Sequence, residues 1–333
     1  MNEITSVAID LAKGVFQLHG TDGQGRVRLQ RQVRRAQLLS VLARLPRCEV
    51  TMEACAGAHY WARQLRLLGH EPRLIPAQHV KAFARRQKND RNDAEAIACA
   101  ARQRGIPQVA VKSEEQQAVL AVHRVRTRLL RERIALTNQL HGLLGEFGCV
   151  LPRGLKRLRE ELLCVLDAGT LPALLQSTLR DQLEHLGQLE QRLQTLTRQL
   201  DELARHSEPC QRLMRHRGVG PLIATAFAAE IADPGVFRNG RQVAAWLGLV
   251  PRQHSSGARV RLLGITKRGD PYLRQLLIHG ARGALRHAAR HSDALSRWVL
   301  NVQQRRGANR ASVALANKTA RHLWATLRYS TAS

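Results

Sequence analysis

The pattern of apolar residues changes at Ser113, and this change limits the folds that the chain can adopt. Before Ser113, short apolar or alternating segments typical of strands are separated by segments with helical periodicity. After it, the apolar residues recur at the three- and four-residue steps of long helices. The first part therefore predicts an α/β domain with a mixed central sheet and helices, and the remainder predicts a mainly helical region.

The part before Ser113 is regular enough to predict individual elements. Gly and Asp turn residues separate its first three strands, which favours a strand meander. The expected strands are 4–9, 14–19, 27–30, 49–53, 72–75 and 109–111, and the expected helices are 36–45, 58–68, 79–87 and 91–104.

Leucines dominate the middle of the chain. Ser113 and Gln116 have the spacing of a capping box, which opens a helix that ends at Gly145. Farther on, leucines follow the a/d steps of a coiled coil, and this seam could pair within the chain or with another subunit. The seam consists of Leu186, Leu189, Leu193, Leu196, Leu200 and Leu203, and Pro209 should end the arm. We expect three domains: 1–112, a helical coiled-coil arm at 113–208, and a mainly helical basic domain at 209–333.

The charge of the chain indicates a polyanionic partner. It contains 53 Lys and Arg against 26 Asp and Glu, a net charge of +27, and 46 of these cations are arginine. Arginine binds phosphate at two points, although a GC-rich genome also raises its frequency. Residues 238–333 hold 18 of the cations against two acids, Asp270 and Asp293, so we expect the polyanion to bind mainly there.

The remaining composition excludes several classes of protein. Its six cysteines never form a C-x-x-C pair, so neither a zinc knuckle nor a disulfide framework is predicted. The N-terminal segment lacks the basic start of a signal peptide, and the most apolar run, 219–232, is too short to cross a bilayer. We therefore expect a cytoplasmic protein that makes no contact with a membrane.

Four carboxylates at the ends of predicted elements suggest a metal site. Asp10 ends the first strand pattern, Glu53 ends the fourth strand, and Asp90 and Asp93 lie one turn apart where a helix begins. Oxygen ligands of this kind suit Mg²⁺ or Mn²⁺, and two such ions could activate the attacking oxygen and stabilise the leaving oxygen of a phosphodiester. Taken alone, Asp90 and Asp93 could instead be a helix cap and a first-turn acid.

A second candidate site is the segment Ser255-Ser256-Gly257. Hydroxyls before a glycine suit phosphoryl transfer when cations surround them, because glycine allows close approach and the cations neutralise phosphate charge. An ordinary basic loop with a serine turn would contain the same residue types. The candidate nucleic-acid-binding cations are Arg252, Arg259, Arg261, Lys267 and Arg268.

Several blocks of the sequence resemble one known family. Asp10 in AIDLAK, Glu53 in MEACAGAHYWA and the block KNDRNDAEAIA are similar to the D-E-D-D signature of the DEDD transposases of insertion-sequence family one hundred and ten. GLVPRQHSSG and GITKRGDPYLR resemble the second conserved domain of that family. The resemblance extends from end to end, with one small departure at Ala258, where the family more often has a second glycine.

The resemblance implies a RuvC-like first domain with an RNase H fold, in which Asp10, Glu53, Asp90 and Asp93 bind metal. It implies that Ser256 is the nucleophile of a transposase that recombines donor and target DNA. A structured non-coding bridge RNA would guide this enzyme, and a dimer or tetramer would combine domains of different subunits in one site. The enzyme would act in the bacterial cytoplasm, on the nucleoid.

Two other hypotheses remain open at this point. A RuvC-like junction resolvase or metal-dependent nuclease would use the four carboxylates with water and would not need Ser256. A basic protein that packages DNA or RNA with an inherited, inactive fold would need neither site.

Overall fold

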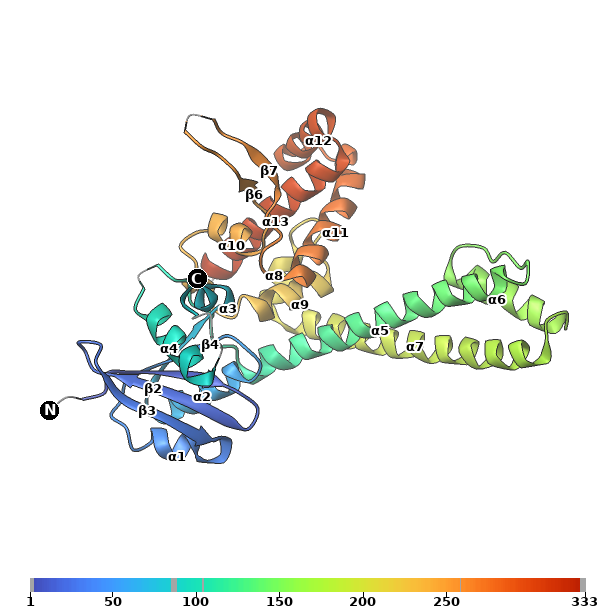
Figure 1. Ribbon diagram of the computed structural model, residues 1–333. Helices are drawn as coiled ribbons and strands as arrows, with labels where there is room; N and C mark the ends of the chain where they lie inside the picture. The colour runs from blue at the N-terminus through green and yellow to red at the C-terminus, as the bar shows by residue number, and fades with distance from the viewer. Residues whose placement is uncertain (1–2, 85–88, 104, 258, 330–333) are drawn as a thin grey trace. The chain divides into compact units, whose positions relative to one another are not determined.

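The computed structural model describes residues 3–84, 89–103, 105–257 and 259–329, with Asp90 described by its backbone alone (Figure 1). The chain forms two compact units. Unit 1 contains residues 1–116 and 230–242, and unit 2 contains residues 117–229 and 243–333.

A five-stranded mixed sheet forms the centre of unit 1. Its strands are β1 (Ser6–Leu11), β2 (Val15–Thr21), β3 (Val27–Arg34), β4 (Glu49–Glu53) and β5 (Glu71–Ile75). Their order in the sheet is β3, β2, β1, β4, β5. The first three strands pair antiparallel, whereas β4 is parallel to β1 and β5 is parallel to β4. The helices are α1 (Leu38–Leu42), α2 (Ala58–Leu67), α3 (Ala77–Val80) and α4 (Asp90–Ala101), and short 3₁₀ turns lie at 35–37, 81–83 and 234–236.

The alternation of side chains along β1 gives the sheet two different buried faces. Val7 and Ile9 belong to a core that α1 and α2 cover, together with Trp61 of α2. Ala8 points the other way and packs with Ile97 of α4 in a second core. Every second residue of β1 therefore faces α4.

Most of the predicted elements of unit 1 are confirmed to within a few residues, but two predictions are wrong. The helix expected at 79–87 ends as an α-helix at Val80, continues as a 3₁₀ turn to Phe83, where Val80 and Phe83 pack beneath α4, and Ala84 is already extended. Residues 85–88 lie outside the described part of the chain. The strand expected at 109–111 is a single bridge from Val109 to Leu74, because the next pair of this antiparallel register sets Val111 opposite Pro72, which has no N–H to donate.

Unit 2 is helical apart from one small hairpin. Its elements are α5 (Glu114–Gly145), α6 (Leu155–Asp167), α7 (Ala173–His206), α8 (Glu208–Met214), α9 (Pro221–Glu230), α10 (Gly240–Trp246), β6 (Pro251–Gln253), β7 (Leu262–Ile265), α11 (Pro271–His287), α12 (Ala294–Arg306) and α13 (Ala308–Tyr329), with a 3₁₀ turn at 288–290. No helix among the described residues is long and apolar enough to span a membrane.

The capping box at the start of α5 is confirmed. The backbone N–H of Gln116 donates to Ser113 Oγ at 3.1 Å, and the backbone N–H of Ser113 donates to Gln116 Oε1 at 2.9 Å. Helix α7 stops at His206, and Ser207 then caps α8. Pro209 lies in the first turn of α8, where a missing N–H costs no hydrogen bond.

The leucine seam is packed within the chain. Helices α5 and α7 lie side by side and run in opposite directions (Figure 1), and α6 joins them in one leucine core. Leu140 of α5 and Leu186 of α7 are fully buried in this core. Arg126 of α5 also donates to Thr197 of α7 at 2.9 Å. The seam therefore needs no second subunit.

The six cysteines are free thiols, as their spacing predicts. Cys48 is buried beneath the sheet, and burial, together with the nearby charge of Glu49, raises the pKa of its thiol to about 11. That thiol is therefore protonated and unreactive at neutral pH.

Truncation of a seam leucine tests whether the seam is internal. Leu186→Ala should lower the free energy of unfolding by about 2–5 kcal/mol, because it opens a cavity in a closed core. Leu203→Ala, at the 39% exposed end of the same seam, is the matched control and should cost less than about 1 kcal/mol. Urea unfolding at several protein concentrations measures both effects. A midpoint that rises with protein concentration would contradict an internal seam.

Candidate carboxylate site and serine hairpin

Asp10 and Glu53 end two neighbouring parallel strands at the same level. Ile9 of β1 is opposite Met52 of β4, so the next position along the two strands pairs Asp10 with Glu53. Glu53 is also level with Ile75 of β5, a residue of the core beneath α4. Side chains level with one another on parallel strands point to the same face. Both carboxylates are therefore half-buried on the face that α4 covers.

The pKa of the Cys55 thiol depends on the charges of both Glu53 and Asp10. This residue follows β4 and is half-buried. Burial, then the charge of Glu53, then the charge of Asp10, raise the pKa of the Cys55 thiol. Both carboxylates therefore lie within reach of the same thiol, since water screens such effects over longer distances.

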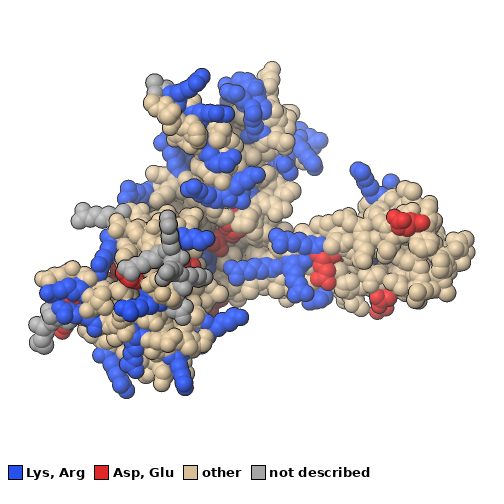
Figure 2. Space-filling model, viewed as in Figure 1, with Lys and Arg blue, Asp and Glu red and all other residues tan. Residues whose placement is uncertain are grey.

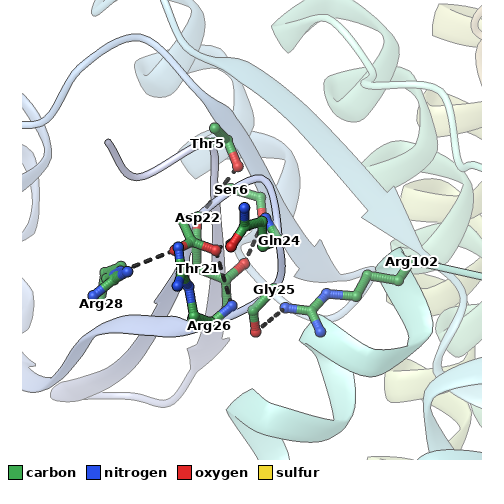
Figure 3. A network of polar contacts seen from close by, with 9 residues as sticks. All are labelled: Thr5, Ser6, Thr21, Asp22, Gln24, Gly25, Arg26, Arg28 and Arg102. Carbon is green, nitrogen blue, oxygen red and sulfur yellow. Dashed lines mark hydrogen bonds and ion pairs between the residues drawn. The ribbon is translucent and has the colours of Figure 1, made fainter. Parts of the chain in front are cut away.

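Helix α4 runs in the direction that brings its first turn to the same edge of the sheet. Arg102, just past its end, donates to the backbone oxygen of Gly25 at 3.0 Å, beside Ser6 at the start of β1 (Figure 3). The last turn of α4 therefore lies at the amino end of β1. A helix of 12 residues and a strand of 6 residues are both about 18–20 Å long, so the first turn of α4 reaches the carboxyl end of β1.

Asp90 and Asp93 are in this first turn, but neither caps the helix. The side chain of Asn89 is the cap, and its Oδ1 accepts from the backbone N–H of Asn92 at 2.8 Å. Asp93 is half-buried and lies one turn before Ile97, on the side of α4 that packs on the sheet. Asp90 begins the same face, and its side chain lies outside the described part of the structure.

The chemistry of these groups fits a hard divalent ion. Asp10, Glu53 and Asp93 offer only carboxylate oxygens, which Mg²⁺ and Mn²⁺ prefer and which zinc sites rarely use alone. Among the side chains that the structure describes, no three acidic, histidine or cysteine groups are close enough together to hold an ion as they stand. The Asp90 carboxylate is not among those side chains.

The sequence did not single out two polar residues of the same face. Gln17 of β2 lies directly opposite Asp10, and His19 lies opposite Ala8. His19 is buried beneath α4, and burial lowers the pKa of its ring. The positions of Gln17 and His19 beside β1 follow from the register of the hairpin that β1 and β2 form. The alternation of residues along each strand does not predict that register.

An acid at the opposite end of the sheet has a structural role (Figure 3). Asp22 begins the turn after β2, and its carboxylate accepts hydrogen bonds from Gln24, Arg26 and Arg28 at 2.9–3.1 Å. Burial alone would raise the pKa of Asp22, but these hydrogen bonds outweigh burial and hold it well below its usual range. Asp22 braces the turn between β2 and β3, and the Asp-Gly spacing of that turn was its sequence signal.

Ser256 lies at the end of the hairpin formed by residues 251–265, which we call the serine hairpin. Strands β6 and β7 form its base, and the N–H of Arg259 donates to the backbone oxygen of Ser256 at 3.1 Å to close the tip. The hydroxyl of Ser255 accepts from the N–H of Arg261 at 3.1 Å. Ser256 is exposed, and its hydroxyl has no hydrogen-bond partner among the described residues. Of the two hydroxyls, that of Ser256 is therefore available to a ligand.

The predicted cations surround this hairpin. Arg252, Arg259 and Arg261 are exposed on it. Lys267 and Arg268 are exposed in the loop that follows, where Lys267 has a φ of +55°. Figure 2 shows Lys and Arg side chains gathered over the hairpin and helices α11 to α13, with few acids among them.

The two acids of this region are both used as helix caps. Asp270 accepts backbone hydrogen bonds at the start of α11, and Asp293 does the same at the start of α12. Hydrogen bonds from Ser296 and then Arg217 hold the pKa of Asp293 well below its usual range. Both acids are therefore engaged at helix starts, and the 18 cations of residues 238–333 still leave the region strongly positive.

Comparison with known proteins assigns a family to both parts of the chain. A family model described as Transposase IS116/IS110/IS902 family matches residues 210–296. A second model, for the DEDD transposases of the IS110 group, matches residues 7–148. The second match contains the four carboxylates, and the first contains Ser256.

Individual relatives match along almost the whole chain. A probable family 20 transposase of Pseudomonas aeruginosa is 50% identical over 98% of this chain and 98% of its own length. The transposase for insertion sequence element IS1111A of Coxiella burnetii is 44% identical over 98% of this chain and 90% of its own length. The transposase for insertion sequence element IS1328 of Yersinia enterocolitica is 39% identical over 97% of both chains.

These relatives define the class of the protein: it is an insertion-sequence transposase, an enzyme that cleaves and joins DNA. The carboxylates at the ends of β1 and β4 and the basic serine hairpin fit this class. The chain belongs to the IS110 family of transposases. Its DEDD domain implies the use of a divalent metal ion.

The thiol of Cys55 can test the placement of the two carboxylates. Glu53→Gln removes a negative charge beside the thiol, so the pKa of Cys55 should fall and its alkylation at about pH 8 should become faster. Asp10→Asn should act in the same direction. Mass spectrometry of the Cys55 peptide, with a chelator present, measures the rate. Glu49→Gln, at the other end of β4, is the control, and an unchanged rate in all three variants would contradict the placement.

Proposed function

We propose that this transposase exchanges DNA strands through a covalent bond between Ser256 and DNA, with Asp10, Glu53, Asp90 and Asp93 as its metal-binding site. One observation carries the proposal most directly. The hydroxyl of Ser256 is exposed at the tip of a basic hairpin, whereas that of its neighbour Ser255 is hydrogen-bonded within the hairpin. A hydroxyl that must attack a phosphate needs this combination of access and surrounding cations.

The architecture supports a three-part enzyme. The strand order of the sheet, with one antiparallel meander and two parallel strands, supports an RNase H-like, RuvC-like domain at residues 1–112. The helical coiled-coil arm would be residues 113–208, and the transposase domain with the serine would be residues 209–333. We place this enzyme in the bacterial cytoplasm, on the nucleoid.

The carboxylates would hold Mg²⁺, or Mn²⁺ in its place. The bound ions would stabilise the negative charge that develops on the phosphate and on the 3′ leaving oxygen. The sheet would hold Asp10 and Glu53 and the first turn of α4 would bring Asp93, so a bound ion would draw these side chains together. Gln17, beside Asp10, could orient a phosphate oxygen through its amide N–H.

The serine step conserves the energy of the bond that it breaks. The Oγ of Ser256 loses its proton and attacks phosphorus, and the bond from phosphorus to the 3′ oxygen breaks. The product is a phosphoserine ester and a free 3′ hydroxyl. Attack by the 3′ hydroxyl of another strand reverses the chemistry and releases the serine. Arg252, Arg259, Arg261, Lys267 and Arg268 would bind the DNA backbone during both steps.

Guide RNA and assembly are further parts of the proposal. A structured bridge RNA that pairs with donor and target DNA would choose the sites, so the protein would need backbone and shape contacts rather than base readers. The 46 arginines suit that role. The carboxylates and Ser256 lie in different units of the fold, so a dimer or tetramer could build each site from two subunits.

Covalent trapping tests the serine step. Wild-type protein, incubated with donor and target DNA, Mg²⁺ and the RNA of the element, should form a protein–DNA adduct that withstands denaturing electrophoresis. Ser256→Ala should form none, and the matched control Ser255→Ala should keep its rate to within about tenfold, since it loses one hydrogen bond of the hairpin. Asp10→Asn should bind DNA but form adduct at least about 100-fold more slowly.

The same experiment separates the alternatives. Cleavage that persists in Ser256→Ala but is lost in Asp10→Asn would show a metal-dependent nuclease that uses water. Salt-sensitive binding with no cleavage by the wild type would show a nucleic-acid-packaging protein.

Thermal unfolding tests the metal site without any DNA. Mn²⁺ at about 100 times its dissociation constant should stabilise the wild type by about 2.7 kcal/mol. Asp10→Asn and Glu53→Gln should lose this stabilisation. Glu49→Gln, at the opposite end of β4 where Thr51 and Arg73 contact its carboxylate, should keep it. Equal stabilisation of Asp10→Asn and wild type would place the ion elsewhere.

A further inference from the structure

A buried polar network in unit 2 joins the arm to the helix that follows the serine hairpin. His123 of α5 is 1% exposed. Its Nδ1 lies 2.8 Å from Oη of Tyr272 in α11, and its Nε2 lies 3.0 Å from Oγ1 of Thr225 in α9. Neither the carboxylates nor Ser256 belongs to this network. The proposed chemistry does not use this buried histidine, whose two ring nitrogens are both hydrogen-bonded.

Thr225 determines which ring nitrogen of His123 carries the hydrogen. The hydroxyl of Thr225 donates to the backbone oxygen of Pro221 at 2.8 Å, so toward His123 it acts as an acceptor. The Nε2 of His123 therefore donates, and Nδ1 of the neutral ring accepts from the Tyr272 hydroxyl. Burial, and then the charge of Arg126, lower the pKa of His123 to about 4, so the ring is neutral at physiological pH.

Tyr272 lies in the first turn of α11, and the loop before α11 also holds this turn in place. Asp270 accepts from the backbone N–H groups of Tyr272 at 2.7 Å and Leu273 at 3.3 Å. Gly269 has a φ of +85°, and a Cβ there would lie 1.9 Å from the backbone oxygen of Trp246. The loop can approach the turn at residue 246 this closely only with glycine at that position.

The base of the serine hairpin is bonded to the same first turn. Arg274 of α11 donates to the backbone oxygen of Leu247 at 3.0 Å. The N–H of Thr266 donates to the backbone oxygen of Val250 at 2.8 Å. Val250 precedes β6 and Thr266 follows β7. Arg274 also donates to the backbone oxygen of Arg268 at 3.2 Å, so the start of α11 and the two segments that carry the hairpin form one hydrogen-bonded body.

A small rotation of this body moves the tip of the hairpin, where Ser256 lies, by a larger distance than it moves the base. Ser256 lies five residues beyond the start of β6, a distance of about 17 Å along an extended chain. A rotation of about 3° at the base would move its hydroxyl by about 1 Å, and an error of that size can slow a reaction about 100-fold.

We propose that the hydrogen bond from Tyr272 to His123 positions Ser256, by holding the first turn of α11 and with it the base of the serine hairpin. This inference rests on the proposed function, because it concerns the nucleophile assigned there. His123 and Tyr272 are positioning residues that touch neither DNA nor the reacting atoms. The arm thereby contributes to the geometry of a serine more than 100 residues away in sequence.

Tyr272→Phe tests the contact with the loss of a single oxygen atom. At saturating DNA, the rate of adduct formation should fall at least about 10-fold, because Phe loses the bond to His123 and the contacts of the hydroxyl with Thr127 and Arg126. The dissociation constant for DNA should stay within about twofold, since no phosphate contact is removed.

Two substitutions of His123 separate positioning from a general loss of stability. In His123→Asn the amide oxygen can take the place of Nδ1 and accept from Tyr272, so the rate should stay within about threefold of the wild type. In His123→Gln the amide nitrogen can take the place of Nε2 and donate to Thr225, so the Tyr272 bond is lost and the rate should fall about 10-fold. Each variant keeps one of the two ring bonds, so their melting temperatures should fall by similar amounts.

The outcomes are distinct from those that test the proposed function. If the wild type forms no serine adduct, the proposed function fails. If the wild type forms the adduct and Tyr272→Phe and His123→Gln form it equally fast, the positioning role is wrong. Equal slowing of His123→Asn and His123→Gln would also overturn it, because the rate would then follow stability alone.

Discussion

The parallel pairing of β1 with β4 is the constraint on which the carboxylate site depends. It places Asp10 and Glu53 at the same level and on the same face. A shift of one residue in this register would turn one carboxylate into the core beneath α1 and α2. Helix α4 then adds Asp93, because it crosses that face toward the amino end of β1. The buried residues Ala8 and Ile97 hold strand and helix together.

The two units offer different groups to a phosphodiester. The carboxylates of Asp10 and Glu53 in unit 1 repel a phosphate by themselves, so they would act on DNA only through bound cations. In unit 2, the two acids of residues 238–333 are both helix caps, and cations surround an exposed hydroxyl. Neither unit has by itself the whole set of groups that strand exchange through a serine would require.

How far the sequence predicts this structure depends on how local each signal is. Alternation and turn residues identified the strands that end in Asp10 and Glu53, and the capping box located the start of α5. The sequence offered Asp90 as a possible cap of α4, whereas the backbone conformation and the hydrogen bond from Asn92 assign the cap to Asn89. The partner of the leucine seam depends on α6, which turns the chain back. The bond between His123 and Tyr272 joins residues 149 apart, and no local pattern indicates it.

In the proposed enzyme, the carboxylates of one subunit and the serine of another would serve one reaction. Mixing two inactive variants, Ser256→Ala and Asp10→Asn, tests it most directly. In a mixed dimer, one of the two sites would contain an intact carboxylate set and an intact serine. The account predicts that an equal mixture regains about a quarter of the wild-type adduct, since about half of the dimers are mixed. A mixture as inactive as either variant alone, under conditions where the wild type associates, would contradict it.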